Sequence, residues 1–365
     1  MNSNLESLYK IAQKPTRTII GLMSGTSLDG LDVALCEISG SGEETKVNLI
    51  QFDTIDYSQD IKSEIRSVFA KQTIDFQKLV LLNEWIGTLH AEIILECLNR
   101  WDIAPEKVDL IASHGQTVFH APKILHQQEK FPNATLQIGD GDHIAVKTGI
   151  ITLSDFRQKH VAAGGEGAPL AVYGDYFLFS KKGDNRIMLN MGGISNFTYL
   201  PASSNPEEVF VTDTGTGNTL IDAFTKLYFP NKSYDKDAEI AKKGIVNKVL
   251  LTSLKSDDFF TKPFPKTTGP ELFSVEYVTK AQAVSNTQNI SIPDLLATLT
   301  RFSAETIAEA IHTAISNTIY TVENFTIYMS GGGAHNPLLA EWLKELLPCQ
   351  FSTTDTLGIS GDAKE

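Results

Sequence analysis

Three short turns in the sequence consist almost entirely of glycine and small polar residues. They span residues 24–27, 213–218 and 330–336, and each follows an apolar segment that predicts a β-strand. Because glycine has no Cβ, such turns let backbone N–H groups approach an anion, and neighbouring hydroxyls add donors. One such turn is a weak signal, since glycine also tightens ordinary hairpins. Three of them after separate strands favour a ligand with several phosphates, such as a nucleotide.

The two commonest phosphate-binding patterns are absent from the sequence. It contains no GxxxxGK[ST], and no GxGxxG lies between a predicted strand and helix with an acidic residue about twenty positions further on. The usual P-loop and Rossmann interpretations are therefore excluded.

Asp213 stands at the head of the second turn. A carboxylate in this position could act as a general base, or it could simply cap the turn by accepting backbone N–H groups. The residues alone favour the cap, and both interpretations stay open at this point.

The predicted elements occur in the same order twice, although no sequence repeat relates the two halves. Residues 18–38 predict a hairpin, 46–55 a strand, 77–101 a helix and 108–112 a buried strand that stops in the polar segment 113–117. The second set is a hairpin at 186–199, a strand at 209–212, a helix at 294–320 and a strand at 325–329. The helices carry apolar faces that are expected to be core: Leu82, Trp85, Leu89, Ile93 and Cys97 in the first, and Leu295, Leu299, Phe302, Ile307, Ile311 and Ile315 in the second. This order predicts an α/β protein with two similar lobes, residues 1–185 and 186–365, around an active-site cleft.

Composition limits the kind of partner. The chain has 365 residues, 42% hydrophobic and 21% charged, which excludes a disordered or collagen-like protein. With 31 Lys and Arg against 44 Asp and Glu, the net charge is −13, and without a basic tract neither nucleic acid nor an anionic membrane is an expected partner. The three separated cysteines indicate neither a disulfide framework nor a structural zinc, and no signal peptide or membrane-spanning stretch is present. A cytoplasmic protein is expected.

Residues 21–32, Gly-Leu-Met-Ser-Gly-Thr-Ser-Leu-Asp-Gly-Leu-Asp, closely resemble the opening signature of the anhydro-N-acetylmuramic acid kinases. This family belongs to the actin, hexokinase and heat-shock-protein ATPase superfamily. Further segments agree with the family in order along the chain: 113–117, 155–157, 162–170, 190–196 and 331–336. The resemblance therefore covers nearly the whole sequence.

The resemblance implies two ribonuclease-H-like lobes of the actin-like ATPase type that close on ATP and a sugar. It also implies a reaction of peptidoglycan recycling, in which 1,6-anhydro-N-acetylmuramic acid, ATP and water give N-acetylmuramic acid 6-phosphate and ADP. The residues that would bind ATP with its Mg²⁺ are Gly25, Thr26, Ser27, Leu28, Asp29, Gly30, Leu31, Asp32, Gly215, Gly217, Asn218, Gly331, Gly332 and Gly333. Those that would bind the amino sugar are His114, Gln116, Thr117, Arg157 and Gly165. No protein-held metal is expected, and whether Asp29 or Asp32 approaches the magnesium stays open.

By the same resemblance, Asp213 matches the family's catalytic base, which would take a proton from the water that attacks the anomeric carbon. An inverting glycosidase normally uses two carboxyl groups. Here the γ-phosphoryl group could capture the departing O6, so that one base suffices. Arg157 could pair with the lactyl carboxylate of the sugar or form only a surface ion pair, and His114 could contact the sugar or be a satisfied hydrogen-bond partner.

The sequence departs from the family pattern in one loop. Gln158, Lys159 and His160 stand where many members have Arg, Arg and Asp, and Glu166 stands where glutamine is common. Lys159 keeps a positive charge but not the bidentate fork of arginine. Members also continue through a C-terminal helix beyond Glu365, so reduced activity is one expectation. Two alternatives follow: a sugar kinase of the same fold that acts on a different amino sugar, and a non-catalytic ATP-binding switch. A homodimer is expected from the family only.

Overall fold

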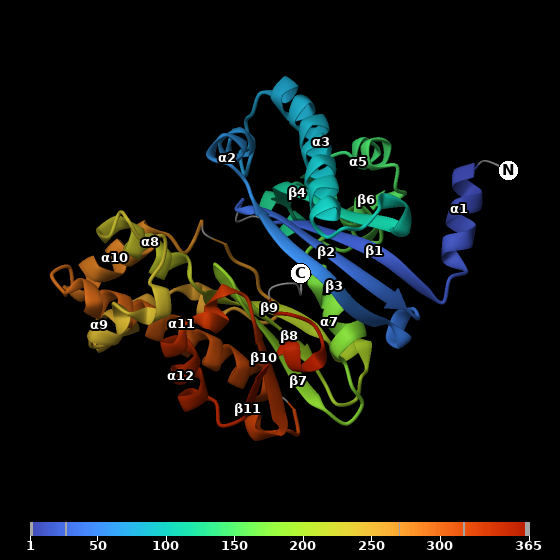
Figure 1. Cartoon of the computed structure of the whole chain (residues 1–365). Helices are drawn as coiled ribbons and strands as arrows, with labels where there is room; N and C mark the ends of the chain where they lie inside the picture. The colour runs from blue at the N-terminus through green and yellow to red at the C-terminus, as the bar shows by residue number, and fades with distance from the viewer. Residues whose placement is uncertain (1–2, 26–27, 270, 317, 362–365) are drawn as a thin grey trace. The chain divides into compact units, whose positions relative to one another are not determined.

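The computed structural model describes residues 3–25, 28–269, 271–316 and 318–361 (Figure 1). The chain divides into two compact units, Met1–Ala171 and Val172–Lys364, and each contains one mixed β-sheet with helices. The predicted α/β class is confirmed. The division falls near residue 171 rather than 185 because Phe179, on helix α7 (Ala171–Phe179), packs with Met188 and Leu200 of the second sheet.

The first sheet has the strand order β3-β2-β1-β4-β5, and β6 also pairs with β4. Its strands are β1 (Thr16–Ser24), β2 (Gly30–Ser39), β3 (Lys46–Asp56), β4 (Leu110–Ala121), β5 (Ala134–Ile138) and β6 (Thr152–Ser154). Strands β1 to β3 form an antiparallel meander, in which Ile20 pairs with Leu35. Strand β4 is parallel to β1, with Ile20 opposite Ile111, and β6 is parallel to β4.

The helices of the first unit are α1 (Ser3–Ala12), α2 (Gln59–Arg66), α3 (Phe76–Arg100), α4 (Lys123–His126), α5 (Gly141–Thr148) and α6 (Phe156–Ala162). Helix α3 begins after Asp75, whose side chain accepts the N–H of Lys78, and it packs on the sheet with α5 beside it (Figure 1). Ile86 and His90 lie at the centre of its buried face, which is fully enclosed there. Trp85, predicted to belong to that face, is 38% exposed, so the prediction was wrong at this position. Ile86, the residue after Trp85, takes the buried position instead.

The second sheet has the order β11-β10-β7-β8-β9. Its strands are β7 (Asn185–Met191), β8 (Ile194–Leu200), β9 (Phe210–Thr216), β10 (Phe325–Ser330) and β11 (Gln350–Thr353). The helices are α7, α8 (Thr219–Tyr228), α9 (Lys248–Leu254), α10 (Val275–Ser285), α11 (Ile292–Ser316) and α12 (Pro337–Leu346). All six apolar residues predicted for the face of α11 are buried.

Both units share one strand order. In each, three antiparallel strands are followed by two strands parallel to the first: β3-β2-β1-β4-β6 and β9-β8-β7-β10-β11. This is the order of ribonuclease-H-like domains. The two halves therefore have the repeated architecture that the element order predicted, without a sequence repeat.

Two strands continue where the sequence predicted that they stop. Strand β4 runs through 113–117, and β9 runs through 213–216. Each contains a glycine with positive φ, Gly115 at 76° and Gly215 at 132°, and the strand register shifts near it. Such bulges let a strand carry small polar residues and then resume pairing. The polar segments thus lie within strands rather than beyond them.

Among the described residues, none of the helices combines the length and the apolar character needed to span a membrane.

Candidate active site

The first predicted phosphate turn joins β1 to β2. Thr26 and Ser27 lie outside the described residues. Leu28 and Leu31 are buried in the core of the first unit, so only their backbone could face a ligand. Asp29 is exposed, and its Oδ1 accepts the N–H of Gly30 at 3.1 Å. The Asp32 carboxylate accepts the hydroxyl of Thr54 at 2.5 Å across β2 and β3. Two acidic side chains thus follow this turn, one just before β2 and one within it.

His114 and Arg157, both predicted to bind the sugar, contact each other. Arg157 Nε donates to His114 Nε2 at 2.8 Å, and His114 Nδ1 bonds the carbonyl of Gly115 at 2.9 Å. Burial and the charge of Arg157 lower the pKa of His114 to about 4, so the ring is neutral at physiological pH. The tautomer that satisfies both bonds carries its proton on Nδ1.

The guanidinium of Arg157 is only partly occupied by these bonds. Its Nη1 donates to the carbonyl of Gly167 at 2.7 Å. No partner for Nη2 is found among the described ranges, so one edge of the group is available to an anion. A surface ion pair of Arg157, the competing interpretation, does not occur among the described residues.

The residues that depart from the family pattern hold the loop after α6. Gln158 Nε2 donates to the carbonyl of Thr135 at 2.9 Å, which ties α6 to β5. His160 Nδ1 accepts the N–H of Gly167 at 3.2 Å. A Cβ on Gly165 would stand 1.9 Å from His160 Nε2, so a larger residue there would displace the His160 ring. Lys159 is exposed. Gln158 and His160 therefore have structural roles around helix α6, which carries Arg157.

Gln116 and Thr117 have their polar side-chain groups engaged within the protein. Gln116 is fully buried, and its amide bonds Ser24, Gly25 and Thr117. The Thr117 hydroxyl accepts from Gln137 Nε2 at 3.3 Å. The Gln116 amide therefore has little hydrogen-bonding capacity left for a ligand.

In the second unit, the backbone of the second predicted phosphate turn is bound to the hairpin between β7 and β8. The N–H groups of Gly217 and Thr219 donate to Gly193, at 2.8 and 3.1 Å, and that of Asn218 donates to Gly192 at 2.9 Å. A Cβ on Gly217 would lie 2.3 Å from the Gly192 carbonyl oxygen, so only glycine fits. The amides expected to approach phosphate are thus occupied in this structure.

Two buried hydroxyls beside this turn have no partner among the described residues. They are Ser195 Oγ and Thr216 Oγ1, and a Cβ on Gly217 would stand 2.7 Å from the former. Buried hydroxyls normally have hydrogen-bond partners. The two hydroxyls could therefore bind a polar ligand, whereas the N–H groups of the turn already donate to carbonyls.

The third turn lies next to the second. Asn218 Nδ2 donates to the carbonyl of Met191 at 3.2 Å, and a Cβ on Gly333 would lie 3.2 Å from the same nitrogen. Gly331 has a φ of 77°, and Gly332 begins a 3₁₀ turn whose first N–H groups have no carbonyl within the turn. The structure thus brings Gly332 and Gly333 of the third turn next to the Asn218 side chain.

Asp213 lies within β9 with its side chain half-buried. Its Oδ2 accepts the N–H of Thr268 at 2.8 Å, and its own N–H donates to the Lys266 carbonyl at 2.9 Å. No partner for Oδ1 is found among the described residues. Burial raises the pKa of Asp213 to about 6, opposed by the Thr268 N–H and assisted by the negative charge of Glu271. This carboxylate could therefore accept a proton near neutral pH.

Lys266 was not singled out from the sequence, yet it shapes the surroundings of Asp213. It is 8% exposed, and its Nζ donates to the carbonyls of Phe259 and Phe260 at 2.9 and 3.2 Å. The ammonium also lies 4.6 Å from the centre of the Phe259 ring. Its backbone N–H bonds the hydroxyl of Thr212 next to Asp213. A lone lysine in a polar segment gives no sequence signal for such burial.

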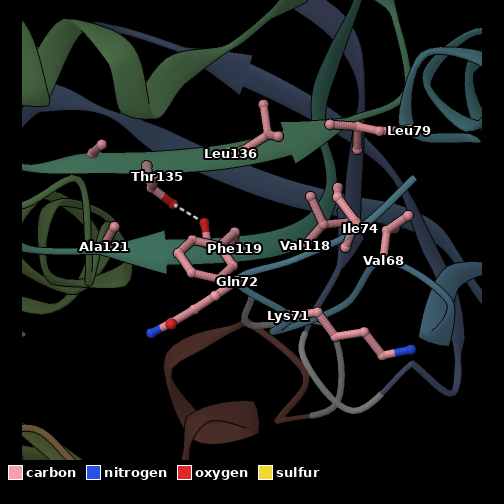
Figure 2. Close-up of a pocket in the computed structure, with 11 residues that line it drawn as sticks. Val68, Lys71, Gln72, Ile74, Leu79, Val118, Phe119, Ala121, Thr135 and Leu136 are labelled. Carbon is pink, nitrogen blue, oxygen red and sulfur yellow. Dashed lines mark hydrogen bonds between the residues drawn. The ribbon is translucent and has the colours of Figure 1, made fainter. Parts of the chain in front are cut away.

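The first unit also contains a cavity of about 280 Å³ beside β4 and β5, shown in Figure 2. Its lining is mainly apolar, with polar side chains at Lys71, Gln72 and Thr135, and Thr135 bonds the Phe119 carbonyl. It contains none of the predicted site residues. The full lining is Val68, Lys71, Gln72, Ile74, Leu79, Val118, Phe119, Ala121, Ala134, Thr135 and Leu136.

One group of side chains has the composition of a metal site. Ligand atoms of Glu84, Asp140 and His143 lie within 4.8 Å of one another. Asp140 caps α5, and His143 Nε2 contacts the Glu84 carboxylate. These contacts account for the group without an ion.

Two ribonuclease-H-like units in one chain define the class of protein as an α/β protein with the actin-like ATPase fold. A sequence model of the anhydro-N-acetylmuramic acid kinases matches residues 17–365, and the chain belongs to this family.

Relatives support the same assignment. The chain is 54% identical to the anhydro-N-acetylmuramic acid kinase of Pseudoalteromonas atlantica, over 100% of this chain and 90% of that protein. It is 38% identical to the enzyme of that name from Caldanaerobacter subterraneus, over 99% of this chain and 91% of that protein. Among solved structures, it is distantly similar to an activator of 2-hydroxyisocaproyl-CoA dehydratase from Clostridium difficile with bound ADPNP. That match has a TM-score of 0.42 and 11% identity, and it covers 95% of this chain and 93% of the other.

Proposed function

We propose that this protein converts 1,6-anhydro-N-acetylmuramic acid, ATP and water into N-acetylmuramic acid 6-phosphate and ADP. The family assignment supports the reaction class. The observation that carries the proposal is the state of Asp213, a half-buried carboxylate with a pKa of about 6 and one oxygen without a partner among the described residues. At pH 7.5 such a group is mostly ionised but still basic enough to take a proton from water.

Asp213 Oδ1 accepts a proton from water as the water oxygen bonds to C1 of the sugar. The C1–O6 bond breaks, and its electron pair goes to O6. O6 then bonds to the γ-phosphorus, and the bond between that phosphorus and the β,γ-bridging oxygen breaks, which releases ADP. An inverting glycosidase uses a second carboxyl group to protonate the leaving oxygen. Here the γ-phosphoryl group captures the leaving oxygen, so no second carboxyl group is needed to protonate it.

Arg157 is proposed to bind the lactyl carboxylate of the sugar through Nη2. Because Nε and Nη1 already bond His114 and Gly167, this contact uses one nitrogen rather than a complete fork. The neutral His114 serves mainly to orient Arg157, since both of its ring nitrogens are engaged.

ATP is proposed to bring Mg²⁺ with it. Carboxylate oxygens are the ligands that Mg²⁺ prefers, and Asp29 and Asp32 at the first turn fit that chemistry. Bound with ATP, the ion would neutralise charge on the phosphoryl oxygens. Asp29 is the more exposed of the two and is the better candidate. A cytoplasmic location and a homodimer stay predictions.

A second candidate function is phosphorylation of an ordinary amino sugar, which the changed loop at Gln158 and His160 favours. The two are separated by measuring ADP release with ATP and either 1,6-anhydro-N-acetylmuramic acid or N-acetylglucosamine. We expect ADP only with the anhydro sugar. Turnover with N-acetylglucosamine but not with the anhydro sugar would replace the proposal by the second candidate.

A further inference from the structure

Four buried polar side chains meet in the core of the first unit. Ser24 ends β1, Tyr57 follows β3, His90 belongs to α3 and Gln116 to β4, and they are exposed by only 1, 3, 0 and 0%. Burial of a polar group costs free energy unless it is hydrogen-bonded. The cluster lies directly under the first predicted phosphate turn, so its contacts bear on that turn.

The four side chains form one continuous chain of hydrogen bonds. His90 Nε2 lies 2.8 Å from the Tyr57 hydroxyl, which lies 3.0 Å from Ser24 Oγ. Ser24 Oγ lies 2.7 Å from Gln116 Oε1 and 2.9 Å from the Gly30 carbonyl. Every link has the length of a normal hydrogen bond.

The direction of each bond follows from the groups at the Gln116 end. Gln116 Oε1 and the Gly30 carbonyl can only accept, so the single proton of Ser24 is directed to them. Ser24 Oγ must then accept the hydroxyl proton of Tyr57. The Tyr57 oxygen in turn accepts the N–H of His90 Nε2. Burial lowers the pKa of His90 to about 3, so its ring is neutral and Nδ1 carries no proton. Consistently, Nδ1 has no partner among the described residues.

The chain of bonds holds both ends of the first turn. Gln116 Nε2 donates to the carbonyl of Gly25 at 2.8 Å, where the turn begins. Ser24 contacts the carbonyl of Gly30, where β2 begins, and the Tyr57 N–H donates to the carbonyl of Asp29 at 2.8 Å. The two flanks are therefore fixed by side chains that a ligand need not touch.

We propose that Gln116 and Tyr57 are positioning residues for the turn that binds the phosphates of ATP, and that Gln116 does not contact the sugar. This inference rests on the proposed function, because it takes the first turn as part of the ATP site. It differs from the sugar-binding role that the family resemblance implied for Gln116.

The test compares Gln116→Leu and Tyr57→Phe with the wild-type protein. Tyr57→Phe removes one hydroxyl and keeps the ring, and Tyr9→Phe, at an exposed tyrosine of the same unit, is the matched control. Loss of a buried hydrogen bond should raise the KM for ATP and the Kd for ADP roughly tenfold in both variants. The KM for the anhydro sugar should stay within about twofold of wild type, and Tyr9→Phe should change neither constant.

Two outcomes would overturn the inference. One is a Gln116→Leu protein whose KM for the sugar rises while its Kd for ADP is unchanged. The other is a Tyr57→Phe protein with wild-type affinity for ADP. Calorimetric binding of ADP needs no turnover, so an absence of product in the wild-type protein would count against the proposed function alone.

A measurement on the wild-type protein keeps the inference testable if Gln116→Leu does not fold. Selective ¹⁵N-histidine labelling with NMR should show His90 protonated at Nε2 and unprotonated at Nδ1 from pH 5 to pH 8. Protonation of Nδ1 instead would reverse the derived bond directions and contradict the network.

Discussion

Replacing Asp213 with asparagine should abolish turnover and stabilise the second unit at alkaline pH. Burial raises the pKa of this carboxyl from its ordinary 3.8 to about 6. The folded state therefore binds the proton more tightly than the unfolded state, and the stability that this provides below pH 4 is lost as the pH rises through 6. A shift of about two pKa units corresponds to about 3 kcal/mol at pH 8. Asparagine carries no charge and avoids this cost, while its oxygen can still accept the Thr268 N–H.

The assay is calorimetric unfolding of both proteins at pH 4 and pH 8. We expect similar stability at pH 4, and at pH 8 a higher Tm for the transition of the second unit in Asp213→Asn. Asp184→Asn is the matched control, because contacts with Lys181 and Arg186 lower the pKa of Asp184 and the change should have the opposite sign. An Asp213→Asn protein that is less stable than wild type at pH 8, or a difference independent of pH, would refute the reasoning.

Three further substitutions test other parts of the site. Lys266→Met removes the ammonium that binds two carbonyls beside the base, and kcat should fall about tenfold with the KM for ATP unchanged in steady-state kinetics. Arg157→Met removes a positive charge, so the pKa of His114 should rise above its value of about 4 in an NMR titration, and the KM for the sugar should rise in the same kinetic assay. Gly217→Ala would place a Cβ 2.3 Å from the Gly192 carbonyl oxygen and should abolish ADP binding measured by calorimetry.

For each of the three substitutions, the contrary result would count against the structure. A wild-type kcat in Lys266→Met would show that the segment around residue 266 positions Asp213 without the Lys266 ammonium. An unchanged pKa of His114 would show that Arg157 lies elsewhere in solution, and normal ADP binding by Gly217→Ala would show that the turn can move.

The repeated order of strands and helices could be predicted from the sequence, because apolar periodicity marks strands and long helices directly. The face of α11 was correct at every position, whereas Trp85 on α3 was misplaced, since two apolar faces one residue apart match the same spacing. Strand ends at 113–117 and 213–216 were also wrong. Small polar residues signal a strand end, but Gly115 and Gly215 instead form bulges inside strands.

Only the candidate site residues that lie in sequence motifs could be predicted. Asp213, His114 and Arg157 were proposed through the family pattern. The structure adds that Arg157 bonds His114 and that burial raises the pKa of Asp213. Lys266 and Tyr57 lie in no glycine-rich turn, and their contacts come from residues far away in the sequence. Only the folded chain reveals such long-range bonds, because a single sequence does not say which buried polar groups are paired.

In the proposed reaction, one base activates water for attack on C1 while the γ-phosphoryl group captures O6. Incubation with ATP, Mg²⁺ and 1,6-anhydro-N-acetylmuramic acid in ¹⁸O-water, followed by mass spectrometry of the sugar, tests it directly. We predict sugar 6-phosphate with ¹⁸O at C1, and no such product from Asp213→Asn. Release of ADP without ¹⁸O in the sugar would show that water does not attack C1, and labelled product from Asp213→Asn at the wild-type rate would show that Asp213 is not the base.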